Sequence, residues 1–384
     1  MRVYFQNRMM STPGGGCSEN IISLCLSESN DNGIIPKKLH EGEEELEEMR
    51  RSRLDFVRIY RLLQTFLRNK TFPSSSECEK HRGCPHTYDD TLIIALWLFQ
   101  TLWRLSYRET LETVSKAGFS VPALSTYHYR IRKIPIPVLQ ELLEQTGEAL
   151  FRRHEGKWQS LMVDGTGYGL RDRYALKWFR GTEVRLVQSH VRLVLLVAVD
   201  DKGKAIVLGG AVGPPYASEV ELLRRILARK STLPSLPLVG DRVYDSIDIL
   251  QQIQKLGAQP AIRIKTTWRY STRHQLRQIS HRGWEEWGSQ RYRIEGVFGS
   301  IKIKVNSVFP LFREDLAMKR ALAAAVLYNL NLLALLTFIL IKTHLIIRFL
   351  FIASASISLH IFRTPGYTLT VDIEHPEQSK CSLG

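Results

Sequence analysis

Apolar residues follow two different patterns along this chain. Between residues 87 and 153 they recur at helical spacing, and the segment YDDTLIIALWLFQTLWRL is apolar nearly all round, as a core helix is. From residue 158 onward, short continuous apolar runs alternate with amphipathic segments. Runs of that length, bounded by turn residues, are typical of buried strands. The pattern therefore predicts a helical region followed by an α/β region.

The α/β region reads as three strands, a helix, a strand, a helix, a strand and a closing helix. The predicted strands are LMVDGTGYGL, HVRLVLLVAVD, KAIVLGGAV, LPLVGD and PAIRIK. The two helices between them are SEVELLRRILARK and SIDILQQIQKLG. The residues DDKG between the second and third strands are an ordinary hairpin turn. Strands that alternate with helices predict an α/β sheet with helices packed on it.

The helical region ends in a basic, aromatic segment, STYHYRIRKI, followed by PIPVLQELLEQTGEALFRR. Two short helices, a turn and a basic third helix resemble a helix-turn-helix unit, whose third helix reads DNA. On this interpretation five side chains face DNA: Tyr127, Tyr129, Arg130, Arg132 and Lys133. The alternative is a plain helical bundle with a basic surface.

The remaining segments set the expected domain boundaries. We expect a disordered segment over 1–40, a helix over 41–70, a linker over 71–86, a helical DNA-binding domain over 87–153, a catalytic domain over 158–340 and a tail over 341–384. The apolar run that begins at Ala321 is long enough for a membrane helix. Because Asn329 and Asn331 lie inside it, we favour a buried helix up to about residue 340 and leave a membrane anchor as the alternative.

Charge and cysteine content narrow the class of protein. The 384-residue chain has a net charge of +15 and a pI of about 9.6, which suits a polyanionic partner. A basic protein without a nucleic-acid role is the alternative. Five cysteines in such a chain form no disulfide framework and favour a reducing compartment. Cys78, His81, Cys84 and His86 match no regular zinc spacing.

Three acidic residues carry the candidate chemistry. Asp164 lies in the first predicted strand, Asp241 ends the fourth, and Glu295 lies in the closing helix. The carboxyl ends of sheet strands are where α/β folds place their sites. Two metal ions about 4 Å apart, held by carboxylate oxygens, activate the attacking and leaving oxygens of phosphoryl transfer. In a basic protein this predicts an enzyme that cuts and joins DNA.

Structural roles compete for each of these acids. Asp164 precedes Gly165 and is also suited to a turn, and Asp241 is also suited to a helix cap. Glu285 and Glu286 compete with Glu295 for the third place.

Cations flank the third acid. Arg291 lies one helical turn before Glu295 and Lys302 two turns after it, so all three share one face. We expect the two cations to hold DNA phosphates, with a solvated, ion-paired helix face as the alternative. Three preceding residues extend this expected phosphate track: Arg263, Lys265 and Arg269.

The order of elements and the three acids resemble the ribonuclease-H-like catalytic core of DDE transposases. The resemblance is to insertion-sequence transposases whose third acid lies in an Arg-x3-Glu-x6-Lys pattern, here Arg291, Glu295 and Lys302, and it covers roughly residues 85–335. Where that pattern has a Tyr three positions before the Arg, this chain has Gly288. The resemblance implies a ribonuclease-H-like mixed sheet flanked by helices and preceded by an all-α domain.

The resemblance also implies the reaction and its partners. Asp164, Asp241 and Glu295 would hold two Mg2+ ions, or Mn2+, that activate water and later a 3′-hydroxyl. The substrates would be double-stranded DNA, namely the terminal inverted repeats of the transposon and the target. A homodimer would join the two ends, in the cytoplasm and associated with the nucleoid, with no membrane role. Two alternatives are an inactive transposase-derived DNA-binding protein and a nuclease of the same fold.

Overall fold

The computed structural model describes residues 54–67, 88–154, 156–179, 183–266, 273–310 and 313–361. The segment expected to be disordered, the linker with its Cys and His residues, Arg269 and the chain after residue 361 lie outside the described residues. Everything described below belongs to one compact unit, Ser52–Gly384.

The first part of this unit is helical, as the periodicity predicts. Its helices are α2 (Phe56–Leu67), α3 (Asp90–Trp103), α4 (Tyr107–Lys116), α5 (Leu124–Lys133) and α6 (Ile136–Arg153). Helix α4 begins with a capping box, because Ser106 Oγ accepts from the N–H of Glu109 and the Glu109 carboxylate accepts from the N–H of Ser106. Helix α6 packs against the sheet, so this region and the sheet share one core. The division into separate DNA-binding and catalytic domains stays a prediction.

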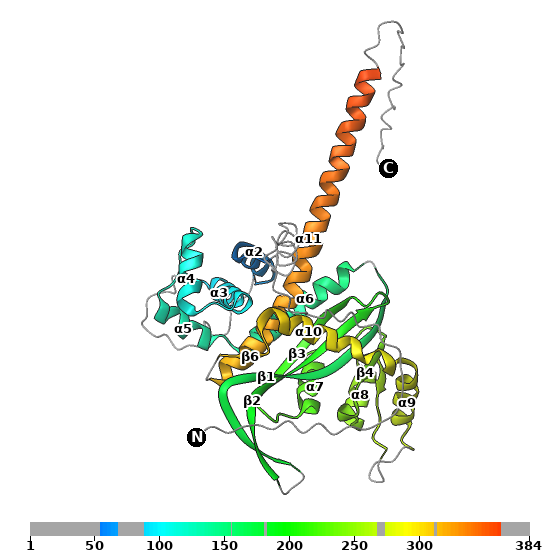
Figure 1. The fold of residues 1–384 in the computed structure, drawn as a ribbon. Coiled ribbons are helices and arrows are strands. Elements are labelled where there is room, and N and C mark those ends of the chain that lie inside the picture. The colour runs from blue at the N-terminus through cyan, green and yellow to red at the C-terminus, as the bar shows by residue number, and fades with distance from the viewer. Residues whose placement is uncertain are drawn as a thin grey trace, which may run out of the picture. The chain divides into compact units, whose positions relative to one another are not determined.

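A mixed six-stranded sheet forms the centre of the second part (Figure 1). Its strands are β1 (Trp158–Phe179), β2 (Glu183–Asp200), β3 (Ala205–Gly213), β4 (Pro237–Gly240), β5 (Gln259–Ile262) and β6 (Val308–Phe309). The order is β3-β2-β1-β4-β5, in which β1, β2 and β3 are antiparallel and β4 and β5 run parallel to β1. The sheet is mixed and flanked by helices, as the sequence predicts.

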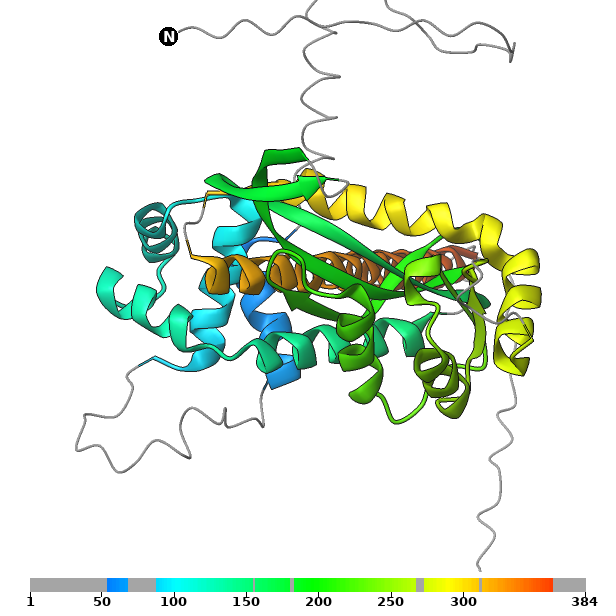
Figure 2. The same ribbon diagram turned by 90° about the horizontal axis from the view of Figure 1, so that it is seen from below.

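The helices of this part connect and cover the strands. They are α7 (Glu219–Ala228), α8 (Ile247–Lys255), α9 (Gln275–Trp287), α10 (Arg293–Val305) and α11 (Glu314–Ile361). Helices α6 and α11 pack on β3, α8 and α9 pack on β5, and α10 packs on β1 (Figure 2).

The structure departs from the sequence prediction at the closing helix. The pattern predicts one helix around Glu295, whereas the chain forms α9, then the short 3-10 helix η2 (Gly288–Tyr292), then α10. The following strand β6, which the pattern does not indicate, pairs with β1 through Gly169 and Leu170. Strand β1 is also longer than predicted and forms a ribbon with β2 beyond the sheet (Figure 1).

The apolar C-terminal run is a helix that packs on the sheet. Residues Glu314–Thr337 of α11 are long and apolar enough to cross a membrane, but 61% of their most apolar window is buried inside the protein. Asn329 explains the polar residue in that run, because its amide accepts from the N–H of Val207 at 3.1 Å and donates to the carbonyl of Val207 at 2.7 Å. The helix was expected to end near residue 340, and it continues to Ile361.

Candidate active site

Asp164 and Asp241 occupy neighbouring positions on two adjacent parallel strands. The register of β1 and β4 pairs Val163 with Gly240, and each aspartate is the next residue along the chain. Asp164 lies inside β1, and Asp241 directly follows the end of β4. Because parallel strands carry successive residues at the same level, the two carboxylates belong to one place at the carboxyl end of β4.

Neither aspartate has the structural role that its sequence context also allowed. Asp164 lies in a strand and not in a turn, and its Oδ1 accepts from the N–H of Gly165 at 2.9 Å. Asp241 is the N-cap residue of the 3-10 helix η1 (Arg242–Tyr244), but its side chain makes no capping hydrogen bond. Asp241 therefore does not cap η1 with its side chain, and Asp164 bonds to the neighbouring backbone without forming a turn.

Arg291 brings the third acid into the same charged environment. From η2 it donates a hydrogen bond through Nη2 to Asp164 Oδ2 at 2.8 Å. Partial burial favours the neutral form of its guanidinium, but three carboxylates outweigh this and raise its pKa, those of Asp164, Asp241 and Glu295. The three predicted acids, which lie on different elements, thus act on one guanidinium.

The Asp164 carboxylate is held in a half-buried place that disfavours its charge. Burial raises its pKa, and the neighbouring charge of Asp241 acts in the same direction. The N–H of Gly165 and the Arg291 guanidinium oppose the rise. Two adjacent carboxylates in such a place need a cation, and in this structure Arg291 supplies it.

Glu295 lies in the first turn of α10 and is exposed. Its competitors, Glu285 and Glu286, lie exposed on α9, where Glu285 pairs with His281 at 3.5 Å. The carboxylates that act on Arg291 include Glu295 and neither competitor. Glu295 is thus the candidate whose charge reaches Arg291, and its role as the third acid stays a prediction.

A buried ion pair anchors the segment that carries Asp241. Asp245, four residues further on, accepts from the guanidinium of Arg277 on α9 and from the N–H of Lys265 at 2.6 Å. Both partners of the ion pair are almost fully buried. Asp245 thus ties the β4 end to α9 and to the β5 end.

Two further residues at the site were not predicted. Glu219, at the start of α7, accepts from the Tyr244 hydroxyl at 3.2 Å and pairs with Arg192 at 3.3 Å. Tyr244 is fully buried in η1, and burial together with the charges of Glu219 and Asp164 raises its pKa. An acid after a capping serine is an ordinary helix start, so Glu219 does not stand out in the sequence as a site residue.

The chemistry of the cluster suits a hard divalent cation. Asp164 and Asp241 offer carboxylate oxygens, the ligands that Mg2+ and Mn2+ prefer. Within the described ranges, however, no three His, Cys, Asp or Glu side chains are gathered into a metal-binding group. The positive charge beside Asp164 is the guanidinium of Arg291, whose Nε is buried without a hydrogen-bond partner. The two aspartates therefore offer oxygen ligands of the kind that a divalent ion prefers, and its binding in place of the guanidinium stays a prediction.

Lys302 lies on α10 over an aromatic side chain. Its Nζ is 5.5 Å from the centre of the Tyr168 ring, which is fully buried and stacked on Phe309. Partial burial lowers the pKa of the Lys302 ammonium. Lys302 therefore packs its stem against β1 and does not project from a fully solvated helix face.

The structure corrects two of the five expected DNA contacts on α5. Tyr127 is fully buried and its hydroxyl donates to Gln100 at 2.9 Å. Arg130 is buried beside Asp90, at 2.5 Å. Both face inward because they share the helix face of the buried Ile131. The other three side chains are exposed: Tyr129, Arg132 and Lys133.

Residues of the expected phosphate track follow β5. Arg263 is exposed, and Lys265 is half-buried, with its carbonyl accepting from Arg277. Arg269 lies outside the described residues. Whether these side chains contact DNA stays a prediction.

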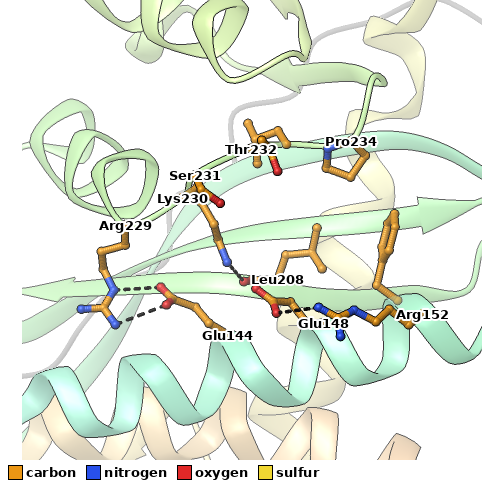
Figure 3. Close-up of a pocket in the computed structure, with 11 residues that line it drawn as sticks. Glu144, Glu148, Arg152, Leu208, Arg229, Lys230, Ser231, Thr232 and Pro234 are labelled. Atoms are coloured by element: carbon orange, nitrogen blue, oxygen red, sulfur yellow. Dashed lines mark hydrogen bonds and ion pairs between the residues drawn. The ribbon is translucent and has the colours of Figure 1, made fainter.

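A pocket of about 460 Å³ lies between α6, β3 and the segment after α7, away from the carboxylate cluster (Figure 3). Its charged side chains pair with one another, Arg229 with Glu144 at 2.8 Å and Arg152 with Glu148 at 3.6 Å. The Lys230 ammonium donates to the carbonyl of Leu208. None of the predicted site residues lines this pocket, so we do not assign it the reaction.

Comparison with known proteins places the chain in a family. Residues 188–330 match the family model of the transposase DDE domain, a range that contains Asp241 and Glu295 and begins after Asp164. An uncharacterised protein of Aquifex aeolicus (strain VF5) is 34% identical over 258 residues, which are 66% of this chain and 80% of that protein.

Solved structures similar to this chain include two transposase complexes. A cryo-EM structure of the piggyBac transposase synaptic complex with hairpin DNA is 8% identical, covers 72% of each chain and has a TM-score of 0.32. A crystal structure of the Mos1 mariner paired end complex with Mn is 12% identical, covers 77% of this chain and 90% of its own, and has a TM-score of 0.17. TM-scores this low do not support a family assignment. The assignment depends on the sequence comparisons and on the carboxylate cluster. On that basis, the chain belongs to the DDE transposase family.

Proposed function

We propose that this protein is a DNA transposase in which Asp164, Asp241 and Glu295 carry out strand cleavage and strand joining. The observations that support this most are that Asp164 and Asp241 lie at one level on the paired strands β1 and β4, and that Arg291, four residues before Glu295, contacts Asp164 at 2.8 Å. Membership of the DDE transposase family supports the same assignment of the three acids.

Each residue of the cluster has a role in this proposal. Asp164 and Asp241, together with Glu295, would hold divalent ions, Mg2+ or Mn2+, whose chemistry is to activate a water or a 3′-hydroxyl and to stabilise the leaving 3′-oxygen. Arg291 holds the carboxylates together before DNA and metal bind, and then turns to a DNA phosphate, for which its forked donors are suited. Lys302, supported by the Tyr168 ring, contacts a second phosphate.

The expected partner is double-stranded DNA, both the terminal inverted repeats of a transposon and its target. The net charge of +15 and the exposed Tyr129, Arg132 and Lys133 on α5 support this partner. We propose a homodimer on the paired ends, since two ends must be cut and joined together, and an association with the nucleoid in the cytoplasm.

Cleavage of transposon-end DNA by the purified protein tests this proposal. The substrate is a labelled duplex that carries the inverted repeat found beside the gene, incubated with Mg2+ or Mn2+. We expect nicking by the wild type and none by Asp241→Asn, while both bind the duplex equally. Asp248→Asn is the matched control, because this exposed aspartate of α8 lies near Asp241 in the chain but pairs with Arg224. Nicking by Asp241→Asn at the wild-type rate would contradict the proposal.

The same assay separates the two alternatives. A nuclease of this fold would nick the duplex but would not join the new 3′ end to a target plasmid. An inactive transposase-derived protein would bind the duplex and leave it intact with either metal.

A further inference from the structure

Glu219 lies directly against the strand that carries Asp164. A Cβ atom added to Gly165, the residue after Asp164, would lie 2.9 Å from the Glu219 carboxyl carbon and 3.1 Å from each of its oxygens. The carboxylate of α7 thus occupies the space that a side chain at position 165 would need. Gly165 is required for this close approach and not for backbone strain, since its φ is not in the left-handed region.

Both oxygens of this carboxylate are already engaged. Oε1 lies 3.3 Å from Arg192 Nη1 on β2, and Oε2 accepts from the Tyr244 hydroxyl at 3.2 Å. The two side chains of the ion pair are largely buried, with 27% of Arg192 and 20% of Glu219 exposed. A carboxylate with both oxygens committed to protein donors is poorly placed to bind a metal ion itself.

Tyr244 connects Glu219 to the second acid. Its ring is fully buried, and its N–H donates to the carbonyl of Asp241 at 3.0 Å within η1. Glu219 therefore contacts the Asp164 strand through Gly165 and the Asp241 turn through Tyr244. A buried ion pair adds little to stability, but it fixes geometry well.

We infer that Glu219 is a positioning residue, which acts through Tyr244 and Gly165 to set the relative placement of the Asp164 and Asp241 carboxylates. This inference depends on the proposed function, because it concerns the same two acids. Partners of this kind, one layer behind a metal's ligands, typically change metal affinity by about 10- to 100-fold when they are removed.

Three substitutions change the link in different ways. Tyr244→Phe removes only the hydroxyl, Gly165→Ala displaces the flexible end of Glu219, and Glu219→Gln keeps an acceptor for Tyr244 while it loses the charge. Glu221→Gln is the matched control, since Glu221 is two residues away on α7 and pairs with Arg224 and Arg225 at the surface. A thermal melt of each variant in EDTA checks that it is folded.

The test has two readouts on the full-length protein. The first is the dissociation constant for Mn2+, measured by EPR. The second is the Mn2+ concentration that gives half-maximal cleavage of transposon-end DNA. We expect Tyr244→Phe and Gly165→Ala to raise both values about tenfold, with Glu219→Gln closer to the wild type than Glu219→Ala, and DNA affinity unchanged within about twofold. The control should match the wild type.

Two results would overturn the inference. If Tyr244→Phe and Gly165→Ala had the Mn2+ affinity and the Mn2+ dependence of cleavage of the wild type, Glu219 would not position the two aspartates. Complete loss of Mn2+ binding in Glu219→Ala, as severe as in Asp164→Ala, would make Glu219 a ligand. Failure of the proposed function gives a different result, in which the wild type neither binds Mn2+ through Asp164 nor cleaves, and that result would overturn both.

Discussion

Arg291 Nη2 lies 2.8 Å from Asp164 Oδ2, and this contact joins the 3-10 helix η2 to strand β1. The pair has 31% of the arginine side chain and 14% of the aspartate side chain exposed. It is thus accessible enough to open, and Asp241 and Glu295 attract the same guanidinium. Arg291 pairs with Asp164 in the absence of metal, and under the proposed mechanism a divalent ion would compete with it.

Replacement of Arg291 should make the fold more dependent on metal. In Arg291→Gln the three carboxylates lose their counter-charge, so we expect a lower melting temperature than the wild type in EDTA and a larger rise on addition of Mn2+. Differential scanning fluorimetry measures both. Arg282→Gln, which removes an exposed arginine of α9, should show the wild-type rise. If Mn2+ raised the melting temperature of Arg291→Gln and of the wild type equally, Arg291 would not be taking the place of a metal ion.

Lys302 should contribute one phosphate contact. Lys302→Ala is expected to weaken DNA binding and to make the log–log dependence of affinity on salt shallower by about one unit. Fluorescence anisotropy over a range of salt concentrations gives this slope. Lys255→Ala, an exposed lysine at the end of α8, serves as the control. A slope identical to that of the wild type would leave Lys302 with only its packing on Tyr168.

The two faces of α5 should separate DNA binding from stability. Tyr127→Phe leaves the buried Gln100 without its partner, so we expect a loss of about 1–3 kcal/mol in the free energy of unfolding and no change in DNA affinity. Lys133→Ala, on the exposed face, should weaken DNA binding and leave the free energy of unfolding unchanged. Urea denaturation and anisotropy distinguish these effects. Weaker DNA binding by folded Tyr127→Phe would argue that Tyr127 turns outward when DNA binds.

Asn329 should matter for stability and not for chemistry. Asn329→Leu would leave the buried N–H and carbonyl of Val207 unpaired, at a cost on the order of 2–5 kcal/mol in the free energy of unfolding. Thr337→Ala, at an exposed position of the same helix, should change it by less than about 0.5 kcal/mol. Urea titrations give both values. A cost below about 1 kcal/mol for Asn329→Leu would show that water replaces the amide.

The sequence was sufficient for the fold class and for the meeting of Asp164 with Asp241, while the catalytic role of the three acids stays a prediction. Asp164 lies within the first predicted strand and Asp241 ends the fourth, and the parallel pairing of these strands brings the two aspartates to one level. Local pattern alone could not show that Arg291 contacts Asp164, because that contact joins residues 127 positions apart. Glu219 was missed for the same reason, since its partners Arg192 and Tyr244 lie on other elements.

The orientation of α5 was predictable in part. Tyr127 and Arg130 share a face with Ile131, and helical spacing places that face toward the core. The interpretation of Tyr127 and Arg130 as DNA contacts overlooked this periodicity. The role of Asn329 was not predictable from local pattern, because its side chain bonds to the backbone of β3, which is distant in the sequence.

Anomalous X-ray diffraction from crystals grown with Mn2+ would locate the metal site itself. The proposed mechanism predicts anomalous density within about 2.0–2.4 Å of both the Asp164 and the Asp241 carboxylates, with Arg291 turned away from Asp164. If Arg291 remains bonded to Asp164 at saturating Mn2+, and no anomalous density lies within that distance of either aspartate, the assignment of this cluster as a metal-dependent active site is wrong.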